Sequence, residues 1–203
     1  MINRYVINTP SRTGSTFLTQ LLQQTTAKQV LQIHNPFFHA SDPETTCMIL
    51  LSRRNLFSAI MSCLVFKQIA LKQFNIFKVN CERSDSEFVH QYNWHKWYNQ
   101  SCDLSLPYAQ IEYLYFEDFI LNPDFILEKF NIPKKSSLNL PAKTPYQAID
   151  LVANYKECKE TFDWLEKNQS VTLIQKPHIL TTQQLNSAYD LSASVTKIMN
   201  QIG

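Results

Sequence analysis

The chain has 203 residues, of which 44% are hydrophobic, so it can fold as one domain (residues 1–203) around a substantial core. A formal net charge of +2 and a sequence pI of about 8.2 exclude a general affinity for nucleic acid. The five cysteines are widely spaced and form no C-x-x-C pair, which argues against a zinc site and a disulfide framework. Reduced thiols, and an N-terminal segment too polar for a signal peptide or an anchor, predict a cytoplasmic protein without a membrane span.

Short apolar runs alternate with longer helical patterns along the chain. Strands are expected at residues 4–8, 29–33, 46–51 and 109–116. Helices are expected at residues 15–24, 55–67, 86–100, 122–130, 154–168 and 182–201, with a proline-containing loop at 132–145. This alternation predicts βαβ units and an α/β fold, in which a parallel sheet has helices on both faces. Ligands of such sheets bind at the carboxyl ends of the strands.

The first junction between a strand and a helix has the sequence TPSRTGST over residues 9–16. It contains Gly14, the only glycine apart from the C-terminal residue. Glycine permits a tight turn and a close approach of the backbone to a ligand, and the helix that follows offers free N–H groups to an anion. Further donors come from Arg12 and from the hydroxyls of Ser11, Thr13, Ser15 and Thr16. An ordinary turn with Ser15 as the helix cap is the alternative, but this number of donors exceeds what a cap needs and favours a phosphate site.

The second junction follows the predicted strand 46–51. It contains Arg53 and Arg54, and Ser62 follows Arg54 by eight residues. Arginine suits a phosphate because its planar fork donates two parallel hydrogen bonds. The alternative is a pair of solvated arginines and an unremarkable helical serine. Two such junctions at one sheet edge can bind a ligand that carries two separate phosphate-like groups.

The first junction differs from the common nucleotide-binding loops. A Walker A loop places lysine directly after its last glycine, whereas here Ser15 follows Gly14 and the cation, Arg12, precedes it. The spacing also differs from that of a G-x-G-x-x-G loop. Both differences argue against ordinary ATP or NAD binding.

Several motifs over residues 4–162 carry a resemblance to one family. The sequence PSRTGSTFL at residues 10–18 resembles the 5′-phosphosulfate loop of sulfotransferases. Arg54-Asn55, with Ser62 eight residues after the arginine, is similar to the 3′-phosphate motif of that family. LYFEDF at residues 114–119, followed by Asn122-Pro123, is similar to its Tyr-Glu-Asp strand end, and residues 150–162 resemble a segment near the C-terminus of bacterial members.

The resemblance implies a P-loop-like α/β/α fold and an enzyme that uses 3′-phosphoadenosine 5′-phosphosulfate (PAPS). Such enzymes move the sulfuryl group of PAPS to a hydroxyl or amine of an acceptor and release 3′-phosphoadenosine 5′-phosphate (PAP). The 5′-phosphosulfate would be held by Thr13, Gly14, Ser15 and Thr16, with Arg12 as the catalytic cation at the leaving phosphate. Arg54 and Ser62 would bind the 3′-phosphate, and the reaction needs no metal.

The general base of this chemistry is expected at His34, which follows the strand 29–33. His39 and Glu44 are the reserves, and an ordinary surface histidine is the alternative. Relatives often carry a carboxylate at this place, and their Arg-Lys-Gly motif has no clear counterpart here. Lys156 and Lys159 are candidate substitutes for that motif, while Glu117 and Asp118 are expected to be structural or near the adenine.

The acceptor and the competing functions stay open. The aromatic helix at residues 86–100 favours a core face, although exposed rings could bind a sugar. A small-molecule or carbohydrate acceptor is expected, and the sequence indicates no oligomeric state. A P-loop-like kinase or nucleotide hydrolase and a non-catalytic nucleotide-binding relative are the two alternatives to a sulfotransferase.

Overall fold

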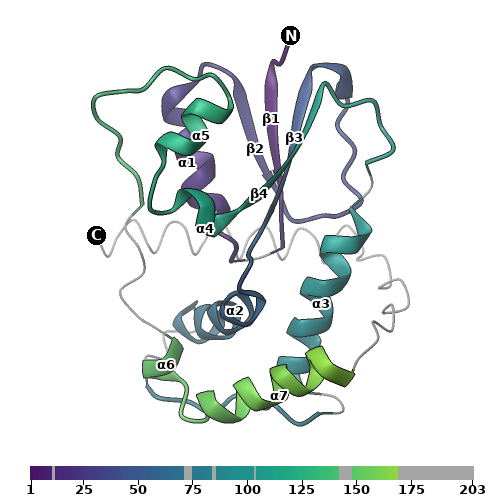
Figure 1. Cartoon of the computed structure of the whole chain (residues 1–203), viewed down its shortest axis with the longest axis vertical. Coiled ribbons are helices and arrows are strands. Elements are labelled where there is room, and N and C mark those ends of the chain that lie inside the picture. Colours follow the sequence, from purple (N-terminus) through teal and green to yellow (C-terminus); the bar gives the residue numbers. More distant parts are fainter. Residues whose placement is uncertain (11, 71–74, 84–85, 103, 142–147, 169–203) are drawn as a thin grey trace.

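The computed structural model describes residues 1–10, 12–70, 75–83, 86–102, 104–141 and 148–168. Its sheet has four parallel strands in the order β2-β1-β3-β4, flanked by helices (Figure 1). The strands are β1 (Arg4–Asn8), β2 (Gln29–Ile33), β3 (Thr46–Ser52) and β4 (Gln110–Tyr115). The predicted α/β fold with a parallel sheet is therefore confirmed. β1 and β2 have the predicted bounds, β3 is one residue longer, and β4 ends at Tyr115 because Phe116 begins a helix.

The longer helices lie close to their predicted positions. They are α1 (Ser15–Thr25), α2 (Leu56–Ala70), α3 (Glu87–Ser101), α5 (Asp124–Lys129) and α7 (Tyr155–Asn168). Three short elements were not predicted, namely η1 (Pro43–Thr45), α4 (Phe116–Phe119) and α6 (Ala148–Leu151). The predicted helix at residues 182–201 lies outside the described residues. No helix in the described part of the chain combines the length and apolarity needed to cross a membrane.

The core has two clusters of buried side chains. The first packs the sheet against α1, α4 and α5, with Ile7, Leu18, Leu22 and Ile49 fully buried. The second joins α2, α3, α6 and α7 through residues such as Phe88. Figure 1 shows that α2, α3, α6 and α7 lie beyond the carboxyl ends of the strands. The carboxyl edge of the sheet thus faces a helical layer.

The strand order brings the two predicted junctions together. β1 pairs with β2 on one side and with β3 on the other, so the chain passes through α1 to β2 and then crosses to β3. The direction of winding therefore reverses between β1 and β3. Ligands of open α/β sheets bind at such switch points, outside the carboxyl ends of the strands. Residues 9–14 follow β1 and residues 53–55 follow β3, so both junctions lie at this place.

Candidate functional site

The loop after β1 is shaped by its own threonines. Thr9 Oγ1 lies 2.8 Å from the carbonyl oxygen of Leu51 in β3 and also contacts the Thr13 hydroxyl. Thr13 is 1% exposed, and its Oγ1 lies 3.1 Å from the carbonyl oxygen of Pro10. The Thr13 hydroxyl is thus used inside the loop, so only the backbone of Thr13 stays available for the predicted contact with a phosphate. Ser11 lies outside the described residues.

Gly14 occupies a position that no other residue fits. Its φ of 86° lies in the left-handed region, and a Cβ atom there would be 2.0 Å from Cδ2 of Phe116. Gly14 is the N-cap of α1 and has no side chain with which to cap it, while Ser15 is the first helical residue and is buried. The alternative of Ser15 as an ordinary cap is therefore wrong. Among the described residues, no side chain caps the N–H groups of the first turn of α1, and Thr16 next to them is exposed.

Arg12 connects the first junction to helix α2. Its φ is 62°, an uncommon value for a residue other than glycine. Its Nε lies 3.4 Å from Ser62 Oγ, and its guanidinium lies 4.3 Å from the ring centroid of Phe66. Burial lowers the pKa of Arg12, although an arginine stays charged at any ordinary pH. Two motifs 50 residues apart in the sequence are therefore in contact.

Arg54 does not join this contact. Its Nη2 donates to Asp118 at 2.6 and 2.8 Å, its Nε lies 3.2 Å from the same carboxylate, and its guanidinium lies over the Tyr115 ring. The hydrogen bond to Asp118 raises the pKa of Arg54, which is exposed. The described contacts thus pair Ser62 with Arg12 and Arg54 with Asp118. The two residues are not in contact with each other, and the prediction that Arg54 and Ser62 bind one 3′-phosphate stays a prediction.

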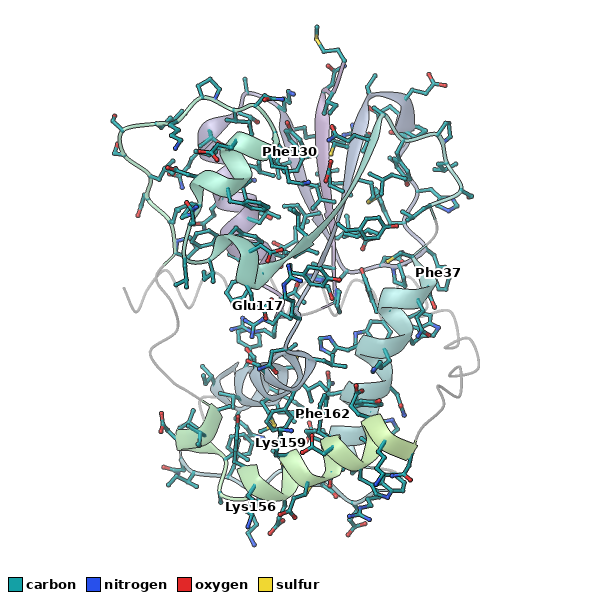
Figure 2. The ribbon with its side chains drawn as sticks, in the orientation of Figure 1. Phe37, Glu117, Phe130, Lys156, Lys159 and Phe162 are labelled. Atoms are coloured by element: carbon teal, nitrogen blue, oxygen red, sulfur yellow. The ribbon has the colours of Figure 1, made fainter. Side chains whose placement is uncertain are left out.

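The N-terminus of α2 differs from that of α1 because it is already capped. Asn55 Oδ1 accepts from the backbone N–H of Ser58 at 2.9 Å. The Glu117 carboxylate accepts from the backbone N–H groups of Arg54 at 3.1 Å and Asn55 at 3.4 Å. Glu117 and Asp118 thus join the end of β4 to the start of α2, as the structural role expected of them requires, and Figure 2 shows Glu117 between the sheet and the helical layer. The backbone N–H groups of Arg54, Asn55 and Ser58 are therefore already hydrogen-bonded to side chains.

Arg53 is a candidate that the sequence analysis did not single out from the pair. It is half-buried, with its guanidinium 4.4 Å from the ring centroid of Phe116 and its Nη1 3.2 Å from Ser58 Oγ. Its Nε is buried and has no hydrogen-bond partner among the described residues. Burial lowers its pKa, although Glu117 acts in the opposite direction. The sequence gives no signal that separates Arg53 from Arg54, because β3 is buried along most of its length and does not alternate.

His34 lies beside the loop after β1, where a general base was expected. Its Nδ1 is 2.8 Å from the carbonyl oxygen of Thr9, so Nδ1 carries the proton and donates. Nε2 then has the free lone pair, which accepts from Gln32 Nε2 at 3.0 Å. Desolvation of the ring lowers the pKa of His34 and is only partly offset by the hydrogen bond to Thr9, although the residue as a whole is exposed. A neutral imidazole with this tautomer can take a proton at Nε2.

The reserve bases occupy different places. His39 is exposed in the segment between β2 and η1. Glu44 lies in η1, directly before β3, and so at the amino edge of the parallel sheet. This edge is opposite the one that carries Arg12 and His34. The topology therefore separates Glu44 from the two junctions.

Two buried groups near the arginines carry no charge at neutral pH. His95 is 1% exposed, and its Nε2 lies 3.6 Å from Cys63 Sγ. Burial lowers the pKa of His95 to about 4, with Arg53 acting in the same direction. Burial raises the pKa of Cys63 to about 12, against the attraction of Arg12 and Arg53. The positive charge of this region therefore comes from the arginines.

The lysines proposed as substitutes for the Arg-Lys-Gly motif lie on α7. Lys156 is 3.9 Å from Glu160, Lys159 pairs with Asp163, and Lys159 also lies over the ring of Phe162. Figure 2 shows Lys156 pointing away from the sheet, at the far side of the helical layer. Lys159 lies 5.7 Å from the ring centroid of Phe57 in the first turn of α2, but neither lysine contacts Arg12, Arg53 or Arg54 among the described residues.

The aromatic helix α3 contributes mainly to the core. Phe88, Tyr92, Trp97 and Tyr98 are each at most 5% exposed, which confirms the predicted core face. Tyr98 also donates to Asn8 at the end of β1, and Trp97 packs against the exposed ring of Phe37. This end of α3 therefore borders the same sheet edge as His34.

The site as a whole can bind anions and accept a proton. It joins the uncapped amides of α1, the two half-buried arginines and a neutral imidazole at one switch point. The described residues contain no cluster of histidine, cysteine, aspartate and glutamate that could hold a metal ion. No protein-family model matches the chain, and no curated protein is significantly similar to it.

Proposed function

We propose that this protein is a PAPS-dependent sulfotransferase of P-loop-like fold, which transfers a sulfuryl group to a hydroxyl or amine of a small-molecule or carbohydrate acceptor. The contact between Arg12 Nε and Ser62 Oγ carries the proposal, because it joins the two motifs that resemble the phosphosulfate and 3′-phosphate motifs. The switch-point geometry and the uncapped N-terminus of α1 support it.

PAPS would supply an activated sulfuryl group to this site. In the transfer, the bond from sulfur to the acceptor oxygen forms while the bond from sulfur to the phosphate oxygen breaks, and the electron pair of the broken bond stays on PAP. The amides of Gly14, Ser15 and Thr16, at the N-terminus of α1, would donate to the oxygens on which this charge develops. Arg12 adds a full positive charge there, and a half-buried cation stabilises charge more strongly than an exposed one.

His34 would take the proton of the acceptor. Its Nδ1–H is fixed on Thr9, which leaves Nε2 as the basic atom. An acceptor hydroxyl would replace the amide of Gln32 at Nε2. Because the pKa of His34 is below its usual value, the ring is neutral and ready to accept a proton at pH 7.

Calorimetric titration tests the donor site. We expect PAP to bind without magnesium and more tightly than ATP, and we expect Arg12→Ala to reduce sulfuryl transfer from PAPS by about 100–1,000-fold. Arg83→Ala is the matched control, because Arg83 is an exposed arginine that lies over Trp164 on α7. Magnesium-dependent preference for ATP would instead favour the kinase or hydrolase alternative. PAP binding without transfer to a broad panel of acceptors would favour a non-catalytic relative.

A further inference from the structure

Arg12 and Arg53 lie against one face of α2. Arg53 contacts Ser58, whereas Arg12 contacts Ser62 and Phe66. Ser58, Ser62 and Phe66 follow one another at intervals of four residues and therefore share one face of α2. Neighbouring positions on this face are about 6 Å apart along the helix axis. Two guanidinium groups thus lie on neighbouring turns of the same helix.

Among the described residues, the two arginines have no ion-pair partner. Neither makes an ion pair with the described residues, whereas Arg54 is paired with Asp118. Repulsion from Arg53 contributes to the lowered pKa of Arg12. Glu117 is near Arg53, but its oxygens accept from the backbone of residues 54 and 55. Within the described residues the two positive charges are thus only partly balanced, through Glu117, and this excess of positive charge favours an anion.

The Arg53 side chain also has an unused donor. A buried N–H without a partner costs free energy, so native proteins rarely leave one unless water or a ligand accepts from it. Arg53 Nε is such a group. The Phe116 ring that stacks on Arg53 is the same ring that approaches Gly14, so Arg53 lies next to the N-terminal turn of α1.

We propose that Arg53, and not Arg54, is the arginine that binds the 3′-phosphate of the ligand, together with Ser62. This inference rests on the proposed function. Arg53 then supplies the cation that the missing Arg-Lys-Gly motif provides in relatives. Arg54 has a structural role, since it holds the end of β4 to the start of α2 through Asp118.

The test compares PAP with 5′-AMP, which lacks the 3′-phosphate, by calorimetry. We expect Arg53→Ala to weaken PAP binding by about 10–100-fold and to leave 5′-AMP binding nearly unchanged, because only the hydrogen bonds to the 3′-phosphate are lost. Arg53→Lys should recover part of the loss, since it keeps the charge without the planar fork. Arg54→Ala should keep the preference for PAP over 5′-AMP.

Thermal unfolding of each variant shows whether it is folded. If Arg53→Ala is not folded, the conservative Arg53→Lys variant still tests the assignment. Loss of the preference in Arg54→Ala, with the preference kept in Arg53→Ala, would overturn this assignment and leave the proposed function intact. Absence of PAP binding by the wild-type protein would overturn both.

Discussion

At the scale of single residues, Gly14 is the position at which a small change should have the largest effect. We expect Gly14→Ala to lower the free energy of unfolding by about 2 kcal/mol or more. The left-handed φ of 86° alone costs alanine roughly 1–2 kcal/mol, and the new Cβ would also overlap the Phe116 ring. Urea denaturation measures the loss, and PAP titration should show weaker binding, because the first turn of α1 must shift.

A double-mutant cycle separates the two causes of this loss. In Gly14→Ala/Phe116→Ala the overlap is gone but the backbone strain stays, so the two changes together should cost less than the sum of the separate changes. Simple additivity would show that the ring does not restrict this position.

His95 gives the molecule a pH dependence whose sign follows from its burial. Its pKa falls from an ordinary 6.5 to about 4 on folding, so between these values the unfolded chain binds more protons than the folded protein. The contribution of the neutral, buried His95 to the free energy of unfolding is complete above pH 6.5 and is lost as the pH falls towards 4. The shift corresponds to roughly 3 kcal/mol. We expect urea denaturation at pH 7, 5.5 and 4.5 to show this loss in the wild type and not in His95→Gln.

His90→Gln is the control for this measurement, because His90 is an exposed histidine of the same helix. Carboxylates titrate in the same range, so the informative quantity is the difference between wild type and variant at each pH. A difference that stays constant from pH 7 to pH 4.5 would contradict the assignment to His95.

At the scale of elements, the sequence predicts those whose pattern is long enough to repeat. The apolar residues of β1 and β3 and the spacing of Leu18, Leu21 and Leu22 in α1 come from burial in the first core cluster. η1, α4 and α6 have three or four residues, which is too short for a periodic pattern. The alternation of β4 continues to Phe116, so the sequence predicts a strand up to this residue, whereas in the structure Phe116 begins α4 and its ring packs beside Gly14.

The candidate site was predictable in its place and less so in its details. Gly14 and Arg12 stand out in the sequence because a strand, a turn and a helix follow one another there, and the parallel sheet then fixes the edge on which they lie. The partner of Arg54 was not predictable, since Asp118 is 64 residues away and reaches Arg54 only through the pairing of β3 with β4. Likewise, only the topology shows that Glu44 lies at the opposite edge.

At the scale of the whole molecule, the site lies between the two core clusters. The amides of α1 belong to the first cluster, and Ser58 and Ser62 belong to a helix of the second. Helix α3, which carries residues of the second cluster, is also linked to β1 of the first, because Tyr98 donates to Asn8 at the end of that strand. A ligand that contacts both junctions would therefore bind only the arrangement in which the clusters are together.

This arrangement predicts how a ligand stabilises the chain. At a PAP concentration 100 times its dissociation constant, the free energy of unfolding should rise by about 2.7 kcal/mol, because PAP binds the folded state alone. Hydrogen exchange should show this increase equally for buried amides of β1 in the first cluster and of α7 in the second, since opening either cluster releases the ligand. Arg83→Ala should give the same increase, whereas Arg12→Ala should give a smaller one in both clusters. Protection confined to β1 and α1 would mean that the helical layer opens with the ligand still bound, and that Ser58 and Ser62 take no part in holding it.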